Sequence, residues 1–191
     1  MIKYAITGNI ASGKSEAEKI LSKNGFIVFD TDTMTHDILI DMPEPSEAFR
    51  EYDVFEYGRL SRSKLSDLVF NNHELKKKLE NIIHPLIKQE LEDIFKTYAD
   101  EKYIFVSVPL LFEAGWENMF DKIILITCNK KTQIERLMSR NKLSENDALK
   151  RLNTQLPPDI KIPKSDIVIE NNSLIDDLDK KIMKFIHTEL Q

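Results

Sequence analysis

The octet Gly8-Asn9-Ile10-Ala11-Ser12-Gly13-Lys14-Ser15 fits the phosphate-binding pattern G-x-x-x-x-G-K-[ST] and follows an apolar run at residues 2–6 that is typical of a buried strand. Glycines let the backbone curl until successive amide N–H groups point inward, and the following helix adds the positive end of its dipole. In this pattern Lys14 reaches the β- and γ-phosphates and the Ser15 hydroxyl coordinates Mg²⁺. The alternative is a glycine turn that only caps a helix, but the strand–loop–helix context favours a triphosphate site.

Glu16 comes directly after the octet, close to the expected phosphates. We expect its carboxylate to face solvent while its backbone N–H still donates to the nucleotide. The residues predicted from this segment to bind ATP are therefore Gly8, Asn9, Ile10, Ala11, Ser12, Gly13, Lys14, Ser15 and Glu16.

Composition narrows the class of protein. The chain has 191 residues, of which 41% are hydrophobic, and this is enough for one globular core with an inserted subdomain. A formal net charge of -5 lacks the basic footprint of a nucleic-acid-binding protein, so a small phosphorylated substrate is expected instead.

Cys128 is the sole cysteine and is predicted to be a buried thiol. Neither a signal peptide nor an apolar stretch of roughly 20 residues is found, which predicts a cytoplasmic protein without a membrane partner.

Four further apolar runs predict the rest of a sheet, at residues 26–29, 103–108, 122–127 and 166–169. Helices are predicted at residues 14–24, ending at a left-handed Gly25, and at residues 174–187, beginning after Ser173 and burying Leu174, Leu178, Ile182, Phe185 and Ile186. Strands that alternate with helices indicate an α/β protein with the P-loop NTPase fold and a five-stranded parallel sheet. Ligands then bind at the carboxyl ends of the strands, near Gly8, Asp30, Pro109 and Asn129.

About 70 residues separate the second and third predicted strands without a strand signal, which is too long for a plain connection. We expect a helical, acceptor-binding insertion at residues 38–99, with helices at 65–70, 73–83 and 85–98. Pro85 suits the first position of the last of these helices.

Two more helices are predicted between residues 131 and 155, within a segment 131–159. Ile134, Leu137 and Met138 share one face of the first helix, and Ser144 with Asp147 caps the second. The basic residues of this segment are Arg136, Arg140, Lys150 and Arg151. They indicate either a solvated helix surface or, beside a phosphate loop, a mobile lid. The nucleotide-binding core is then residues 1–37, 100–130 and 160–191.

Phosphoryl transfer to an alcohol requires in-line positioning, neutralisation of charge and often a carboxylate that accepts the proton. Asp32 follows the second strand and is the candidate base, although Asp30 or Asp32 could instead cap a helix at residues 33–40. Many phosphate-loop enzymes place a metal-binding Asp at a strand end, where this chain has Ser107. Ser107 cannot replace a charge, so Mg²⁺ would rest on Ser15, phosphate oxygens and water. Asp32 is then the nearest plausible carboxylate and Glu113 a second possibility, although Glu113 could equally cap a turn.

These motifs together resemble the dephospho-coenzyme A kinase family. The resemblance spans nearly the whole chain and rests on residues 7–15, Asp30-Thr31-Asp32, Arg62 with Leu65, Val69-Phe70, residues 79–85, residues 109–113, Arg136, Arg140, Arg151, Gln155 and residues 166–171. Members of this family transfer the γ-phosphoryl group of ATP to the 3′-hydroxyl of dephospho-coenzyme A in the last step of coenzyme A biosynthesis. The resemblance thus implies ATP and Mg²⁺ as cofactors and dephospho-coenzyme A as the small-molecule substrate.

The resemblance also implies roles for single residues. Asp32 would deprotonate the 3′-hydroxyl, while Lys14 and Arg140 would stabilise the transferring group. Residues implied to bind the acceptor are Asp32, Arg62, His84, Lys88 and Glu113, and those implied to approach ATP are Arg136 and Asn171. His84 could instead cap the helix that begins at Pro85.

Three positions depart from the family pattern: Glu16 stands where Thr is usual, Lys88 where Arg is usual, and Ser107 where Asp is usual. Lys88 keeps a positive charge but lacks the forked geometry of guanidinium. Two rival functions stay open, a kinase acting on another acceptor and a module that binds ATP to switch a partner. We expect a monomer or a weak homo-oligomer.

Overall fold

The computed structural model describes residues 1–70, 72–172 and 175–190. It divides into two compact units, one formed by Met1–Asp30 with Asp100–Gln191 and the other by Thr31–Ala99. The sequence placed the first boundary after residue 37, whereas the structure places it after Asp30.

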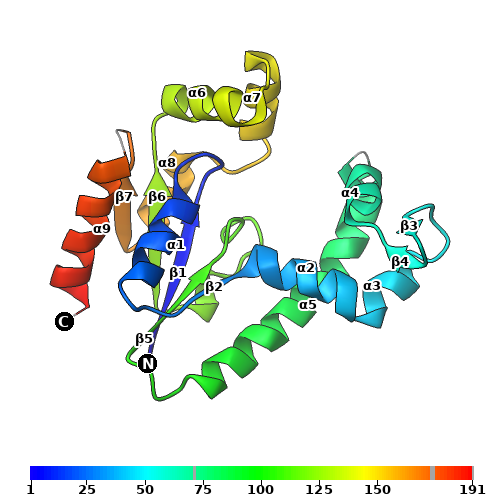
Figure 1. The fold of residues 1–191 in the computed structure, drawn as a ribbon, viewed down its shortest axis with the longest axis horizontal. Helices are drawn as coiled ribbons and strands as arrows, with labels where there is room; N and C mark the ends of the chain where they lie inside the picture. The colour runs from blue at the N-terminus through cyan, green and yellow to red at the C-terminus, as the bar shows by residue number, and fades with distance from the viewer. Residues whose placement is uncertain (71, 173–174, 191) are drawn as a thin grey trace. The chain divides into compact units, whose positions relative to one another are not determined.

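The first unit is built on five parallel strands in the order β2-β5-β1-β6-β7 (Figure 1). The strands are β1 (Ile2–Gly8), β2 (Val28–Asp30), β5 (Tyr103–Ser107), β6 (Lys122–Thr127) and β7 (Ile167–Glu170). The predicted five-stranded parallel sheet is therefore confirmed. The second strand lies later in the chain than predicted and is only half-buried, because β2 is an edge strand with a neighbour on one side only.

Helices surround this sheet and follow the predicted order. They are α1 (Lys14–Lys23), η1 (Glu117–Met119), α6 (Lys130–Asn141), α7 (Glu145–Leu152), α8 (Pro158–Lys161), η2 (Ile162–Lys164) and α9 (Ile175–Glu189). Gly25 follows α1 with a φ of 86°, which is the left-handed conformation predicted for it. The predicted Ser173 cap and the predicted burial of Leu174 lie outside the described residues.

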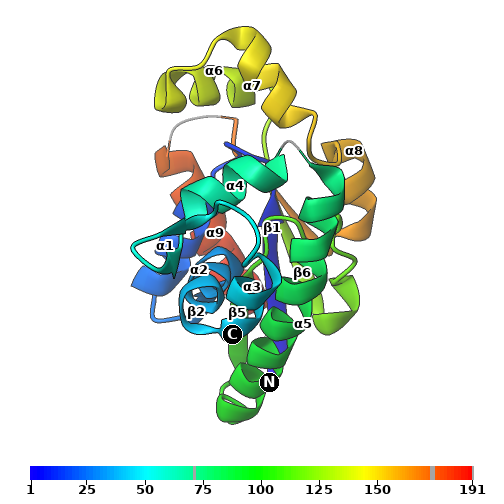
Figure 2. The same cartoon turned by 90° about the vertical axis from the view of Figure 1, so that its right-hand side faces the viewer.

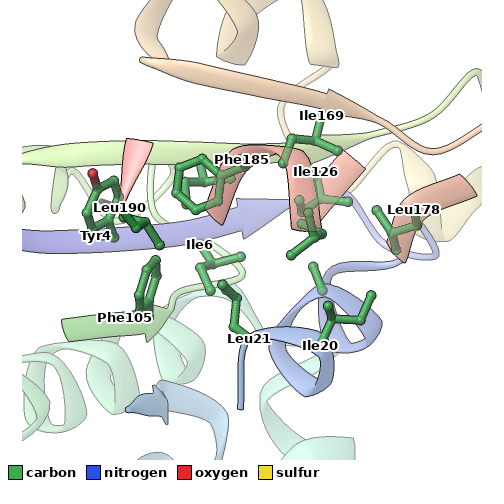
Figure 3. Packing of buried hydrophobic residues seen from close by; sticks show 13 residues of the cluster. Tyr4, Ile6, Ile20, Leu21, Phe105, Ile126, Ile169, Leu178, Phe185 and Leu190 are labelled. Carbon is green, nitrogen blue, oxygen red and sulfur yellow. The ribbon is translucent and has the colours of Figure 1, made fainter. Parts of the chain in front are cut away.

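An apolar core joins α1 and α9 to one face of the sheet (Figure 3). Tyr4 and Phe105 stack with ring centroids 5.0 Å apart, and Phe185 of α9 meets Tyr4 edge-on at 5.9 Å. Each fully buried side chain of this size contributes about 1.5–3 kcal/mol to folding. This packing holds α1, and with it the phosphate loop, in place on the sheet.

The second unit consists of helices and one small hairpin. Its elements are α2 (Thr31–Asp41), α3 (Pro43–Ala48), β3 (Phe55–Glu56), β4 (Arg59–Leu60), α4 (Arg62–Phe70) and α5 (His73–Thr97). The β3–β4 hairpin was not predicted. Its two turn residues, Tyr57 and Gly58, have φ values of 50° and 78°, and two positive values in succession are typical of a tight hairpin turn.

The prediction of separate helices on either side of residue 84 is wrong, because α5 runs without a break through Pro85 (Figure 1). Proline removes one backbone donor, but an apolar stripe at Ile83, Ile87 and Leu91 is buried on both sides of it. The helix is instead capped at Asn72, whose side chain accepts the Leu75 N–H at 3.1 Å. His84 therefore lies inside the helix and is not its cap.

Candidate active site

The phosphate loop, residues 8–15, connects β1 to α1 along a path that only certain residues allow. A Cβ atom on Gly8 would lie 2.5 Å from the Ile126 carbonyl oxygen, so any side chain is excluded there. Ala11 and Gly13 have φ values of 61° and 102°, and Gly13 stands at the N-cap of α1. These turns bring the chain to the amides of Lys14 and Ser15, which precede the first hydrogen bonds of α1 and favour an anion.

The carbonyl groups of the loop are held from outside by side chains. The Arg136 guanidinium donates to the carbonyls of Ala11 and Ser12, both at 3.3 Å, and the Asn171 amide donates to Ser12 O at 2.8 Å. The Gln133 amide donates to Ile10 O at 3.1 Å. Because N–H and C=O of a peptide point in opposite directions, carbonyls held outward favour inward-pointing amides at Ala11 and Gly13. The Ser12 N–H instead donates to Asn9 O at 3.0 Å. Arg136 and Asn171 thus act on the loop backbone in this structure.

Three buried oxygens of the loop and its strand, Thr7 Oγ1, Asn9 Oδ1 and Ser12 Oγ, have no hydrogen-bond partner among the described residues. An unsatisfied buried polar group costs about 1–3 kcal/mol, which a ligand can relieve. The hydroxyl groups of Thr7 and Ser12 can donate to phosphate oxygens. The loop therefore fits a phosphorylated ligand.

The α6–α7 pair packs on this loop beyond the carboxyl ends of β1 and β6 (Figure 2). Leu137 and Leu152 form a small core against Ile10 and Ala11. Met138, predicted on the same inner face, is 38% exposed instead, since its position on the helix turns it away from that core.

The polar residues of the α6–α7 pair follow the prediction in part. The Ser144 hydroxyl accepts the Asp147 N–H at 3.2 Å, so the predicted cap is confirmed. Arg140 is exposed and donates to its neighbour Asn141 at 3.0 Å. Of the basic residues in this segment, only Arg136 hydrogen-bonds the loop among the described contacts.

Lys14 lies in a small polar cluster behind the loop. Its ammonium donates to the Glu18 carboxylate at 2.6 Å and to the hydroxyl of Ser107, which in turn donates to Glu18 at 2.6 Å. The side chains of Lys14 and Glu18 are only 12% and 13% exposed. Glu18 was not predicted from the sequence, although its spacing of four residues from Lys14 on a helix was a usable signal.

Oxygen donors near the loop suit a magnesium ion. Ser15 is exposed in the first turn of α1, and the Glu18 carboxylate belongs to the same helix. Mg²⁺ prefers oxygen ligands and is usually held by one or two protein groups together with substrate phosphates and water. No three His, Cys, Asp or Glu side chains of the described residues gather into a group that could hold a metal ion.

Glu16 and Cys128 lie beside the loop. The Glu16 side chain is 27% exposed and pairs with Lys19 at 3.1 Å, and its backbone N–H donates to Gly13 O at 3.0 Å. Cys128 is buried, as predicted, with Sγ 3.8 Å from Ala11 O, and burial raises the pKa of its thiol.

Glu113 connects the segment after α7 to the sheet. Its carboxylate accepts the Leu156 N–H at 2.9 Å and lies 2.9 Å from the ammonium of Lys161, which is fully buried. The ammonium is close enough for an ion pair but makes no well-aligned hydrogen bond with the described residues. Lys161 was missed because an isolated lysine between prolines carries no burial signal in the sequence.

Comparison with known proteins decides the family. The Dephospho-CoA kinase family profile matches residues 2–177. The chain belongs to this family. A dephospho-CoA kinase from Fusobacterium nucleatum is 37% identical over 186 residues, which cover 96% of each chain.

Solved structures agree with membership in the dephospho-CoA kinase family. A dephospho-CoA kinase from Campylobacter jejuni superposes with a TM-score of 0.76 at 32% identity, covering 97% of this chain and 95% of its own. A crystal structure from Thermus thermophilus superposes with a TM-score of 0.86 at 32% identity, covering 100% and 98%. The P-loop kinase fold is thereby established.

Four of the five residues that the family resemblance assigns to the acceptor lie in the unit Thr31–Ala99, whereas Glu113 belongs to the other unit. Asp32 is exposed in the first turn of α2 and so is not an N-cap, whereas Asp30 directly precedes this helix. Arg62 is exposed at the first position of α4. His84 and Lys88 are one turn apart on α5.

His84 is half-buried and its environment disfavours a charge. Burial lowers the pKa of His84 below its usual 6.5, the carboxylate of Glu80 opposes this shift, and the ammonium of Lys88 adds to it.

In the described part of the chain, no helix is both long and apolar enough to span a bilayer.

Proposed function

We propose that this chain transfers the γ-phosphoryl group of ATP to the ribose 3′-hydroxyl of dephospho-coenzyme A, giving coenzyme A and ADP. The observation that carries the proposal is the family match over residues 2–177, which includes the loop, all of the unit Thr31–Ala99 and most of the other unit. We further predict a cytoplasmic enzyme that is monomeric or weakly associating.

The loop binds the phosphates of ATP in this proposal. Its inward amides, together with Thr7 and Ser12 hydroxyls, donate to phosphate oxygens. Lys14 leaves its contact with Glu18 to reach the β- and γ-phosphates, and Ser15 would be a ligand of Mg²⁺. When bound, Mg²⁺ supplies charge neutralisation between those phosphates.

The α6–α7 pair would act as a lid with two different arginines. Arg136 keeps the loop carbonyls in place and, with Asn171, borders the nucleotide. Arg140 is exposed near the end of α6 and would stabilise the transferring phosphoryl group. The exposed guanidinium can change rotamer without disturbing the packing on the loop.

Asp32 would accept the proton of the acceptor hydroxyl. It follows the carboxyl end of β2 by two residues, and the helix begins early enough to place it in the first turn of α2. A carboxylate at this point can orient the hydroxyl and take its proton as the new bond to phosphorus forms.

Arg62, Lys88 and His84 would bind the acceptor. Arg62 and Lys88 supply positive charge for its phosphates, whereas His84, whose pKa is lowered, would act as a neutral hydrogen-bonding group. Glu113 already binds Leu156 and Lys161, and these contacts favour a supporting role over the direct acceptor contact expected from the resemblance.

Acceptor dependence of ADP formation tests the proposal. The purified chain with MgATP should release ADP only when dephospho-coenzyme A is added, and mass spectrometry should find the product heavier by one phosphoryl group. The Lys14→Ala chain is the control and should release almost none. Equal ADP release without the acceptor, or transfer to adenosine but not to dephospho-coenzyme A, would contradict the proposal in favour of a rival function.

A further inference from the structure

The end of β5 carries a neutral residue at a point where charge is needed. Ser107 is the last residue of this strand, is fully buried, and pairs in register with Ile6 of β1 and Asp30 of β2. Phosphate-loop enzymes commonly place an Asp at such a strand end, where it helps to hold the metal. The Ser107 hydroxyl can form hydrogen bonds but cannot supply that negative charge.

A carboxylate reaches the same point from the helix instead. Glu18 lies four residues after Lys14 and three after Ser15, so the three side chains share one face of α1. The Glu18 carboxylate accepts from the Lys14 ammonium and from the Ser107 hydroxyl, both at 2.6 Å. Both contacts use Oε1, and a carboxylate has further acceptor sites on its second oxygen.

An ordinary helical ion pair does not account for this arrangement. Such pairs are exposed and weak, as in the Lys19–Glu16 pair of the same helix, where Lys19 is 64% exposed. Glu18 is 13% exposed and also bonds a residue of the central sheet. Burial of a carboxylate costs free energy through desolvation unless the charge is paired and hydrogen-bonded, and Glu18 meets this condition through Lys14 and Ser107 together.

We propose that Glu18 is a positioning residue that supplies, from α1, the carboxylate which Ser107 lacks at the end of β5. Without nucleotide, it fixes the ammonium of Lys14. With nucleotide and Mg²⁺ bound, it would accept hydrogen bonds from water ligands of the ion, next to Ser15. The role of Glu18 toward Mg²⁺ rests on the proposed function. Its role as the carboxylate at the end of β5, supplied by the helix and not by the strand, rests on the contacts of Glu18 alone.

Binding of Mg²⁺ and nucleotide tests the role of Glu18 without any acceptor. The measurements are the dissociation constant of ADP with Mg²⁺ and with EDTA, and the Mg²⁺ concentration that gives half-maximal tightening. Glu18→Gln keeps the shape and removes the charge, so it should raise this half-maximal concentration about tenfold, the loss of one charge-assisted contact. Glu18→Ala should do the same, and Lys19→Ala, which breaks the exposed pair, should leave the value within about twofold.

Moving the carboxylate from Glu18 of α1 to position 107 of β5 tests whether the strand end can supply the same charge. Ser107→Asp alone places two carboxylates against one ammonium, so the melting temperature should fall. Adding Glu18→Ala should restore the melting temperature and bring the Mg²⁺ requirement back to within about threefold of the original chain. The double variant then has its charge at the strand end.

Two outcomes would overturn the inference. One is an unchanged Mg²⁺ requirement in both Glu18→Gln and Glu18→Ala. The other is a double variant whose melting temperature is no higher than that of Ser107→Asp alone. Failure of the original chain to phosphorylate dephospho-coenzyme A would contradict only the proposed function, because the ADP and Mg²⁺ measurements need no acceptor.

Discussion

The phosphate loop and the unit Thr31–Ala99 present their polar groups in opposite ways. In the loop, the carbonyls of Ile10, Ala11 and Ser12 are held by side chains from α6 and from the segment after β7. In the other unit, Arg62 and Lys88 are long, exposed side chains on helix surfaces. A site made of held backbone is part of the fold, whereas substitutions of exposed side chains on helix surfaces usually change stability little. Substitutions in the loop should therefore change stability and ligand binding together. Substitutions of exposed residues in the unit Thr31–Ala99 should change function with little effect on stability.

Asp32→Asn should give the largest separation, because Asp32 is exposed and its proposed role lies in the transition state. Turnover should fall by about 10²–10⁴-fold, the usual contribution of a general base. The dissociation constant of ATP and the melting temperature should stay close to those of the original chain. Single-turnover kinetics and calorimetric titration measure the two quantities. Unchanged turnover would remove Asp32 from the chemistry.

Gly13→Ala tests the other half of the comparison and has a matched control in Gly25→Ala. Both glycines have left-handed φ values, of 102° and 86°, so alanine at either position costs about 1–2 kcal/mol in backbone strain. Only at Gly13 does the new Cβ meet a neighbour, the Asn171 amide that holds Ser12 O at 2.8 Å. Gly25 has nothing within 4 Å of such a Cβ atom.

Gly13→Ala should therefore lower both the melting temperature and the affinity for ADP, the latter by at least about tenfold. Gly25→Ala should lower only the melting temperature, and by less. Thermal unfolding and titration with ADP give the two readings. Equal affinity in the two variants would mean that the path of the loop at Gly13 is not needed for nucleotide binding.

Arg136→Gln and Arg140→Gln compare two arginines of one helix. Arg136 bonds two loop carbonyls and Asn171, so its loss should lower the free energy of unfolding by about 1.5 kcal/mol and weaken ADP binding. Arg140 is exposed, so its loss should leave stability unchanged and reduce turnover alone. Chemical denaturation and steady-state kinetics distinguish them. Equal stabilities would contradict a holding role for Arg136.

The same contrast explains what the sequence could predict. The octet and the strand runs at residues 103–108 and 122–127 have local signals, since period and glycine spacing are written in adjacent residues. Glu18, Gln133 and Lys161 acquire their roles from partners far away in the chain, such as Ser107 for Glu18. Pro85 misled the prediction because local propensity yields to a buried stripe on both sides of it.

His84→Gln should give the smallest effect, visible only in the dependence of stability on pH. The folded chain lowers the pKa of His84, through burial first and through Lys88 second, against the opposing Glu80. Below the usual pKa of 6.5, the unfolded state therefore binds more protons than the folded state. Stability from this group is fully present above that value and is lost as the pH falls toward the lowered pKa.

The drop in melting temperature between about pH 7.5 and about pH 5.5 should accordingly be smaller in His84→Gln than in the original chain. Glutamine keeps a hydrogen-bonding group on α5 without a titrating proton, and groups that titrate elsewhere contribute equally to both chains. Thermal unfolding at several pH values measures the difference. An equal drop in both chains would show that His84 protonates as readily in the folded state as in the unfolded state, and a larger drop in the variant would mean that the folded state favours its protonated form. Either result would make His84 a candidate cation for the acceptor phosphates, alongside Arg62 and Lys88.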